Sequence, residues 1–247
     1  MQIKDKINQE SVFYPLASTH PDIQICCVSI PVFAREYLDK IAWQNYNSLK
    51  NITIDETILK QSFLSSEEIE VLNGFKTIKK QIEWMCGRFA IKTLVSSWHS
   101  SCMDYQDIAI AYEEQGAPFL KNFPGLSISI SHSHDYAVGG ISLNKDIEIG
   151  LDIEKIQRKD LNCFMTVAFT QKERLHLPGD SYSKIYKNWT IKEAYLKYIK
   201  KGFNESLKKI EILDEKIFYD NTLLTDVKIV SKNIDGAYAF TLVYGKR

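Results

Sequence analysis

The segment IEIGLDIEK, residues 147–155, carries closely spaced carboxylates. Its apolar residues alternate with polar ones, which is the period of a half-buried β-strand. Asp152 and Glu154 would then share one face of the strand, with their Cα atoms roughly 6.5–7 Å apart. Carboxylates that close repel each other unless a positive charge lies between them. The strand alone leaves two interpretations open: a solvated charged face, or half of a site for a divalent metal ion.

Gly150, inside the same strand, weakens it and is typical of a place where a ligand or another backbone approaches closely.

A second source of acid and base is the predicted helix KNWTIKEAYLKYIKKGF. At 100° per residue, Lys192 falls within the apolar stripe of this helix, where an amine is unfavourable unless it is paired or reaches solvent. Glu193 and Lys197 lie beside that stripe at i and i+4. By themselves they indicate an ordinary ion pair on a helix surface.

The segment SISISHSHDYAV ends a predicted strand with alternating serines and two histidines. Ser131 and His132 at such a strand end could hold a phosphate oxygen or cap a turn. Two histidines are also possible zinc ligands, but the sequence offers no third histidine or cysteine nearby, so we discount zinc.

The composition is that of a soluble globular protein. Of 247 residues, 45% are hydrophobic and 25% charged, with 31 basic and 31 acidic side chains. This balance gives no support to nucleic-acid binding through bulk charge. The five cysteines form no C-x-x-C pair, which indicates reduced thiols. With no signal peptide and no membrane-length apolar run, we expect a cytoplasmic monomer that contacts no membrane.

The order of predicted elements indicates an α+β fold. Strands are expected over 23–30, 107–112, 126–131, 136–143 and 147–154, and antiparallel strands over 207–245. Helices are expected over 34–50, 77–98, 160–167 and 183–200, with further helix starts at the capping box of Ser65 and Glu68 and near residue 170. A boundary near 142–147 divides the chain into halves 1–143 and 144–247.

Taken in order, these segments resemble the Sfp-type 4′-phosphopantetheinyl transferase family between about residues 63 and 205. The segments that carry the resemblance are GRFAIKTLV, Gly116-Ala117-Pro118, ISISHSHDYAV, IGLDIE, FTQKE and WTIKEAYLK. Each motif is weak by itself, and the ordered set is specific. The resemblance implies two similar α+β halves related by a pseudo-two-fold axis, with a ligand cleft between them.

The resemblance also implies the reaction. The 4′-phosphopantetheine group of coenzyme A would pass to a serine of an apo acyl, peptidyl or aryl carrier protein, releasing adenosine 3′,5′-bisphosphate. Asp152, Glu154 and Glu193 would hold Mg²⁺, or Mn²⁺, which accepts the same oxygen ligands. Glu193, directly or through a water, would also take the serine proton.

The contacts to coenzyme A carry over in the same way. Lys192 and Lys197 would contact the phosphates or the pantetheine arm, and Ser131 and His132 the phosphates on the adenosine side. Arg88, with Lys79 or Lys80, is the candidate for the 3′-phosphate.

Two features depart from the family pattern. Ala117 stands where relatives have a lysine or arginine, and Lys121 is the expected substitute. The segment SSEEIEVLNGF is acidic where several relatives are basic. A non-catalytic relative that binds coenzyme A or a carrier protein is therefore one alternative. A metal-dependent nuclease is a remote one, because Ile156 occupies the position at which its motif needs lysine.

Overall fold

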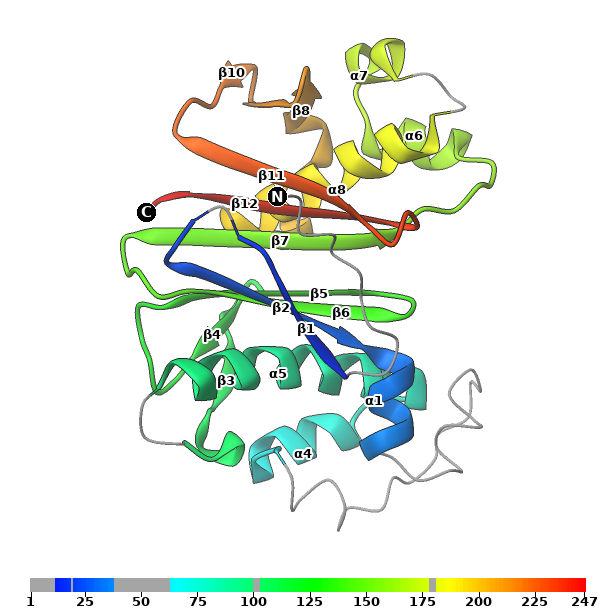
Figure 1. Cartoon of the computed structure of the whole chain (residues 1–247). Helices are drawn as coiled ribbons and strands as arrows, with labels where there is room; N and C mark the ends of the chain where they lie inside the picture. Colours follow the sequence, from blue (N-terminus) through cyan, green and yellow to red (C-terminus); the bar gives the residue numbers. More distant parts are fainter. Residues whose placement is uncertain (1–11, 19, 38–62, 100–102, 178–180) are drawn as a thin grey trace, which may run out of the picture.

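The computed structural model describes residues 12–18, 20–37, 63–99, 103–177 and 181–247 (Figure 1). Its N-terminal elements are β1 (Phe13–Leu16), β2 (Ile23–Ser29), α1 (Ile30–Tyr37), α4 (Ser66–Asn73), α5 (Ile78–Trp98), η1 (Tyr105–Asp107), β3 (Ile110–Tyr112), β4 (Pro118–Leu120), β5 (Ser127–Ser133) and β6 (Tyr136–Ser142).

The C-terminal elements begin with the strand that carries the paired acids. They are β7 (Ile147–Lys155), α6 (Asn162–Ala168), α7 (Gln171–His176), α8 (Tyr182–Tyr198), η2 (Gly202–Asn204), η3 (Leu207–Lys209), β8 (Ile210–Leu213), β9 (Lys216–Tyr219), β10 (Thr222–Leu223), β11 (Val227–Ile234) and β12 (Tyr238–Lys246).

The two halves repeat one topology. In the N-terminal half the strand order is β1-β2-β6-β5, and in the C-terminal half it is β11-β12-β7, with antiparallel pairing in both. The series β2, α5, β5, β6 therefore corresponds to β7, α8, β11, β12, and the corresponding strands have the same neighbours. The predicted α+β fold is confirmed, and this repeat is what a pseudo-two-fold relation requires. The boundary between 1–143 and 144–247 remains a prediction.

The elements form layers around the two sheets (Figure 1). Apolar side chains from β2 and β6 meet those of β7, β11 and β12 in a core between the sheets. Helix α5 covers the outer face of the N-terminal sheet, and α8 covers the outer face of the C-terminal sheet. Each sheet thus buries both faces, and the carboxylate side of β7 looks toward α8 rather than toward solvent.

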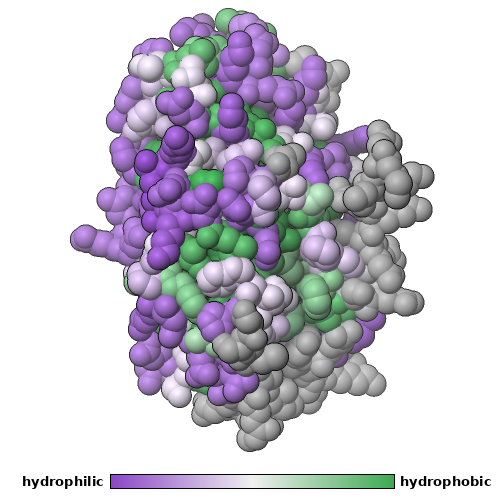
Figure 2. Space-filling view, turned by 60° about the vertical axis from the view of Figure 1, so that its left-hand side comes forward, coloured by the Kyte–Doolittle hydropathy of each residue, from purple (hydrophilic) through white to green (hydrophobic). Residues whose placement is uncertain are grey.

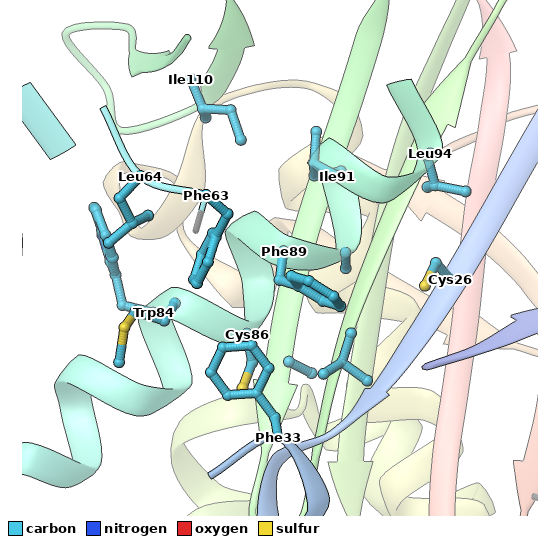
Figure 3. Close-up of a cluster of buried hydrophobic side chains, with 14 of the residues drawn as sticks. Cys26, Phe33, Phe63, Leu64, Trp84, Cys86, Phe89, Ile91, Leu94 and Ile110 are labelled. Atoms are coloured by element: carbon cyan, nitrogen blue, oxygen red, sulfur yellow. The ribbon is translucent and has the colours of Figure 1, made fainter. Parts of the chain in front are cut away.

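The core around α5 is aromatic (Figure 3). Phe33, Phe63 and Phe89 pack edge to face, with ring centroids 5.4–5.8 Å apart. Such pairs stabilise by about 0.5–1.5 kcal/mol beyond the burial of their area. This cluster fixes α5 against the sheet, and therefore fixes the cations that α5 carries.

Each long helix contains a buried lysine with the same kind of partner. Lys192 of α8 is fully buried and donates to Glu173 at 2.7 Å, and Lys92 of α5 donates to Glu68 at 2.5 Å. Each glutamate closes the capping box of the preceding short helix, and each ammonium group also donates to two backbone carbonyls. A buried ammonium group needs this complete set of partners.

This arrangement corrects one predicted site residue. Lys192 was expected to contact phosphate or pantetheine, but its ammonium group is enclosed between α8, α7 and the η3 turn. The apolar stripe indicated correctly that Lys192 points inward. Its role is to join two helices of the C-terminal half, as Lys92 does in the N-terminal half.

Most predicted elements are present, with shifted ends. The stretch predicted as a strand over 107–112 contains the end of η1 followed by β3, and β1 and β4 were missed because they are only four and three residues long. The predicted helix over 34–50 is seen as α1 up to Tyr37, and its remainder lies outside the described residues. The tail forms the expected antiparallel strands, with positive φ angles at Asp220, Asn221 and Asp235 in its turns.

Figure 2 shows a largely hydrophilic face on which apolar side chains are exposed at mid-height. Among the helices in the described residues, none combines the length and apolar character that a membrane span requires.

Candidate active site

A glycine brings helix α8 onto the acidic face of β7. A Cβ atom added at Gly150 would lie 2.0 Å from the carbonyl oxygen of Ala194 and 2.3 Å from the amide nitrogen of Tyr198. Both contacts are with backbone, so a larger residue would push the helix away. The prediction that another backbone approaches Gly150 is confirmed, and Glu193 and Lys197 are thereby brought close to Asp152.

Two of the three predicted acids, Asp152 and Glu193, are buried, and Glu154 is half-buried. Asp152 and Glu193 are only 4% and 7% exposed. Oδ1 of Asp152 accepts from Nζ of Lys197 at 2.8 Å and from Oγ of Ser131 at 2.7 Å. Lys197 therefore pairs with Asp152 across the helix–strand contact, and the interpretation of Glu193 and Lys197 as a solvent-exposed pair on α8 is wrong.

No hydrogen-bond donor among the described residues reaches two buried carboxylate oxygens of this group. They are Oδ2 of Asp152 and Oε1 of Glu193. An unpaired buried acceptor is unfavourable by about 1–3 kcal/mol, and by more when it is charged, so each oxygen calls for a cation or a donor. Carboxylate oxygens are the ligands that Mg²⁺ and Mn²⁺ accept. The donor set therefore fits a hard divalent cation.

The three acids do not converge on one point in this structure. Within the described ranges, no three acidic, histidine or cysteine side chains converge closely enough to hold an ion. Lys197 instead neutralises Asp152. A cation entering here would compete with that ammonium group, which could then turn toward an anionic ligand.

The electrostatics show that the three acids act on one another. Burial, followed by the charges of Asp152 and Glu154, raises the pKa of Glu193 to about 7, although Lys197 opposes the shift. Burial and the charge of Asp152 also raise the pKa of Glu154, while hydrogen bonds from Ser133 and the Trp189 side chain act in the opposite direction. Concentrated negative charge of this kind favours binding of a cation.

A cleft of about 570 Å³ adjoins the acids. Both halves of the molecule line it, as the family resemblance predicts. Its lining includes Lys80, Arg88, Gly116, Ala117 and His132 from the N-terminal half, and Glu193, Lys197, Lys200 and Gly202 from the C-terminal half. Residues from four predicted motifs and the predicted cation Lys80, far apart in the sequence, thus meet in one concave site.

His132 lies at the cationic end of this group. Its Nε2 accepts from Nζ of Lys80 at 3.2 Å, which leaves Nδ1 facing Oε2 of Glu83 at 3.7 Å. Burial, together with the charges of Lys80, Lys197 and Lys79, lowers the pKa of His132 to about 4. His132 is therefore neutral at pH 7 and makes no ion pair with Glu83.

The lowered pKa of His132 predicts a pH dependence of stability. The ordinary pKa of histidine in an unfolded chain is about 6.5, so between pH 6.5 and 4 the unfolded state binds the proton first. Stability should therefore be complete above pH 6.5 and fall as the pH drops to 4. Urea unfolding at pH 7.5 and 4.5 measures this effect. Between these pH values the free energy of unfolding should fall by about 1–3 kcal/mol more in wild type than in His132→Gln. An equal loss in the two proteins would show that His132 is not a buried neutral imidazole.

Arg88 lines the cleft but already has partners. Its guanidinium carbon lies 3.2 Å from the centroid of the Trp84 ring, Nη1 donates to the Tyr112 hydroxyl at 3.2 Å, and Nε lies 3.4 Å from Oε1 of Glu68. The side chain is almost fully buried. Arg88 is held rigidly at the wall of the cleft and can present only part of its guanidinium group to a ligand.

Several expected residues are not part of the lining, including Asp152 and Glu154 of β7, Lys192, Ser131 and Lys121. Ser131 is buried, and its hydroxyl is engaged with β7. Lys121 pairs with Glu67 at 2.7 Å in a neighbouring pocket, so the structure contradicts the expectation that it replaces the cation missing at Ala117.

Lys200 was missed by the sequence analysis. It follows the end of α8 with a φ of 56°, a left-handed conformation that lysine seldom adopts. Its Nζ lies 3.3 Å from Glu113 and 3.4 Å from Glu148, and the residue lines the cleft together with Ala117. The run Lys200-Lys201-Gly202 after a helix was the available signal, but it does not show where the first lysine points.

Comparison with known proteins agrees with this geometry. The family model described as "4'-phosphopantetheinyl transferase superfamily" matches residues 148–243, which contain Asp152, Glu154 and Glu193. This part of the chain is therefore similar to the 4′-phosphopantetheinyl transferase superfamily. The resemblance predicted from the ordered motifs is thereby confirmed.

Several curated members of the 4′-phosphopantetheinyl transferase superfamily are similar to it. The 4'-phosphopantetheinyl transferase psf-1 of Bacillus pumilus is 26% identical over 59% of this chain and 61% of its own length. The 4'-phosphopantetheinyl transferase HetI of Nostoc is 28% identical over 60% of this chain and 64% of its own length. The L-aminoadipate-semialdehyde dehydrogenase-phosphopantetheinyl transferase of Pongo abelii is 27% identical over 63% and 54%. The chain thus spans only about half to two thirds of the length of these transferases.

One solved structure in the comparison is a holo-(acyl-carrier-protein) synthase from Bacillus anthracis in complex with CoA. It is 24% identical, has a TM-score of 0.32, and covers 40% of this chain and 95% of its own.

Proposed function

We propose that this protein transfers the 4′-phosphopantetheine group of coenzyme A to a serine of a carrier protein and requires Mg²⁺, or Mn²⁺, to do so. One observation carries the proposal. The cleft is lined by Lys80, His132, Lys197 and Glu193, and Lys197 pairs with Asp152 behind it. Among the described residues, one buried oxygen of Asp152 and one of Glu193 have no hydrogen-bond partner. This is the combination that a pyrophosphate and its metal ion need.

The proposed reaction joins the carrier to the β-phosphorus of coenzyme A. The serine oxygen forms a bond to that phosphorus, and the bond from the phosphorus to the bridging pyrophosphate oxygen breaks. Adenosine 3′,5′-bisphosphate leaves with the electron pair of that bond, and the serine proton passes to a base. When bound, Mg²⁺ would supply positive charge to the pyrophosphate.

Glu193 is the proposed base, directly or through a water. A base is most effective when its pKa lies near the working pH, and burial raises the pKa of Glu193 to about 7 in the metal-free protein. Asp152 and Glu154 would complete the ligands of the divalent ion.

The cations of the cleft have the complementary task. Lys80 and His132 are proposed to contact the phosphates on the adenosine side, and Lys197 the pyrophosphate, after it releases Asp152. Arg88, which lines the cleft, is proposed to contact the 3′-phosphate. We propose further that the protein acts as a cytoplasmic monomer.

The transferase proposal is tested by incubating the protein with coenzyme A, Mg²⁺ and a panel of apo acyl, peptidyl and aryl carrier proteins. Intact mass should rise by one phosphopantetheine group on at least one carrier, and chelation of divalent ions should prevent the increase. Coenzyme A binding without an increase on any carrier would instead favour a non-catalytic relative.

Lys200 is proposed to supply the phosphate contact that Ala117 lacks. Lys200→Met removes the charge and keeps most of the apolar stem. The KM for coenzyme A should rise about tenfold or more, the effect of losing a charge-assisted hydrogen bond of about 1.5–3 kcal/mol, with a smaller change in kcat.

Two further variants control this test. Lys121→Met removes a lysine that pairs with Glu67 outside the cleft, so its KM should change less than about twofold. Adding Ala117→Lys to Lys200→Met should restore much of the affinity. If Lys200→Met and Lys121→Met have the same KM, Lys200 does not contact coenzyme A.

A further inference from the structure

The edge of β7 that does not pair with β12 is closed by serine hydroxyls. Every second residue of β5 is a serine, and each hydroxyl accepts a backbone N–H of β7 located 22 positions later in the sequence. The pairs are Ser127 with Ile149 at 3.0 Å, Ser129 with Leu151 at 3.0 Å, Ser131 with Ile153 at 3.4 Å, and Ser133 with Lys155 at 3.1 Å. We call these four residues the serine ladder.

The serine ladder also holds the acids of β7. The hydroxyl that accepts the N–H of one residue donates its proton to the carboxylate of the residue before it. Ser131 donates to Asp152 at 2.7 Å and Ser133 to Glu154 at 2.9 Å, and Ser127 donates to Glu148. At the remaining position the residue that would receive the proton is Gly150, which has no side chain, so Ser129 makes only the backbone contact.

Each serine hydroxyl has a single proton and can donate it to only one carboxylate oxygen. The serine therefore determines how that carboxylate is oriented. Oδ1 of Asp152 accepts hydrogen bonds from both Ser131 and Lys197. The other oxygen, Oδ2, is buried and has no hydrogen-bond partner among the described residues. One oxygen of Glu154 receives Ser133. Partners of this kind, which orient the ligands of a metal ion, change metal affinity by about 10- to 100-fold when removed.

We propose that Ser131 and Ser133 are positioning residues that orient Asp152 and Glu154 toward a shared divalent cation. The inference rests on the metal site of the proposed function. It gives Ser131 a different task from a phosphate contact, since its hydroxyl is buried with its proton committed to Asp152 and a backbone N–H on its oxygen.

The serine ladder contains its own controls. Ser127→Ala removes the same two contacts as Ser131→Ala, but at Glu148, which is not a proposed ligand. Ser129→Ala removes the backbone contact alone. All four alanine variants should lower the melting temperature, because each leaves a backbone N–H of β7 without its acceptor. Only Ser131→Ala and Ser133→Ala should weaken metal binding.

The experiment titrates each variant with Mn²⁺ and measures free Mn²⁺ by electron paramagnetic resonance, with and without coenzyme A. The expected result is a rise in Kd of about tenfold or more for Ser131→Ala and Ser133→Ala. Ser127→Ala and Ser129→Ala should stay within about twofold of wild type. If Ser131→Ala does not fold, Ser133→Ala at the end of the ladder carries the same test.

Three outcomes would overturn the inference. Equal Kd values for all four variants would mean that the serine ladder only closes the strand edge. A raised KM for coenzyme A in Ser131→Ala with unchanged Mn²⁺ affinity would make Ser131 a phosphate contact. If Asp152→Asn binds Mn²⁺ as tightly as wild type, the metal site of the proposed function is itself wrong, and the inference falls with it.

Discussion

Asp152→Asn is expected to reduce carrier modification by about 10³-fold or more while leaving the protein folded. Asparagine keeps the shape of the side chain and an oxygen that can accept from Ser131, but it removes the charge that would hold the cation beside the pyrophosphate. Charge stabilisation of a transition state by a metal ion amounts to several kcal/mol, and each 1.4 kcal/mol changes the rate tenfold. Initial rates at saturating coenzyme A and a range of Mg²⁺ concentrations measure the effect.

Glu148→Gln is the matched control for Asp152→Asn. Glu148 lies on the same face of β7, is similarly buried, and receives the hydroxyl of Ser127 as Asp152 receives that of Ser131. Its partners Lys200 and Arg247 are cations rather than a second acid. The rate should fall far less in this variant. Near-normal transfer by Asp152→Asn at limiting Mg²⁺ would remove Asp152 from the metal site.

Glu193→Gln is expected to abolish transfer and to stabilise the metal-free protein. Glutamine keeps the size of the side chain but loses both the charge and the basicity. In the folded protein the pKa of Glu193 is raised to about 7, whereas in the unfolded chain it stays near its usual 4.5. As the pH rises from 4.5 to 7, the unfolded state releases its proton first, so wild type loses stability over this interval.

Glutamine does not ionise, so Glu193→Gln should lack this loss. At pH 7.5 the free energy of unfolding should therefore be about 1–3 kcal/mol larger for the variant than for wild type. This difference should shrink toward pH 4.5. Urea unfolding at both pH values, without divalent ions, measures it. A buried group that lowers stability and is needed for activity is common in active sites.

Lys197→Met is expected to change stability in the opposite direction to Glu193→Gln. It leaves Asp152 buried without its cation, so stability should fall at pH 7.5 and transfer should be reduced. If Glu193→Gln were both active and unchanged in stability, Glu193 would be neither the base nor a ligand.

Local patterns in the sequence determined most helices and strands, and they determined that Asp152 and Glu154 lie on one face of β7. The alternation in IEIGLDIEK depends only on neighbouring residues, and β7 follows it from Ile147 to Lys155. The capping box of Ser65 and Glu68 likewise needs only four consecutive residues. Gly150 indicated a close approach, which is made by the backbone of α8. The ordered motifs predicted the resemblance to the 4′-phosphopantetheinyl transferase superfamily, whose model matches residues 148–243.

Only the tertiary structure decided which partner each charged side chain finds. A helical wheel places Lys192 on the buried face, but its glutamate is 19 positions away and comes from another helix. Ser131 and Asp152 are 21 positions apart and meet because the free edge of β7 lies against β5. The additional lysine that lines the cleft together with Ala117 is Lys200, from the turn after α8, whereas Lys121 pairs with Glu67. Such contacts depend on how two folded halves pack together, and the hydrophobic periods that specify each half contain no information about the distance across their interface.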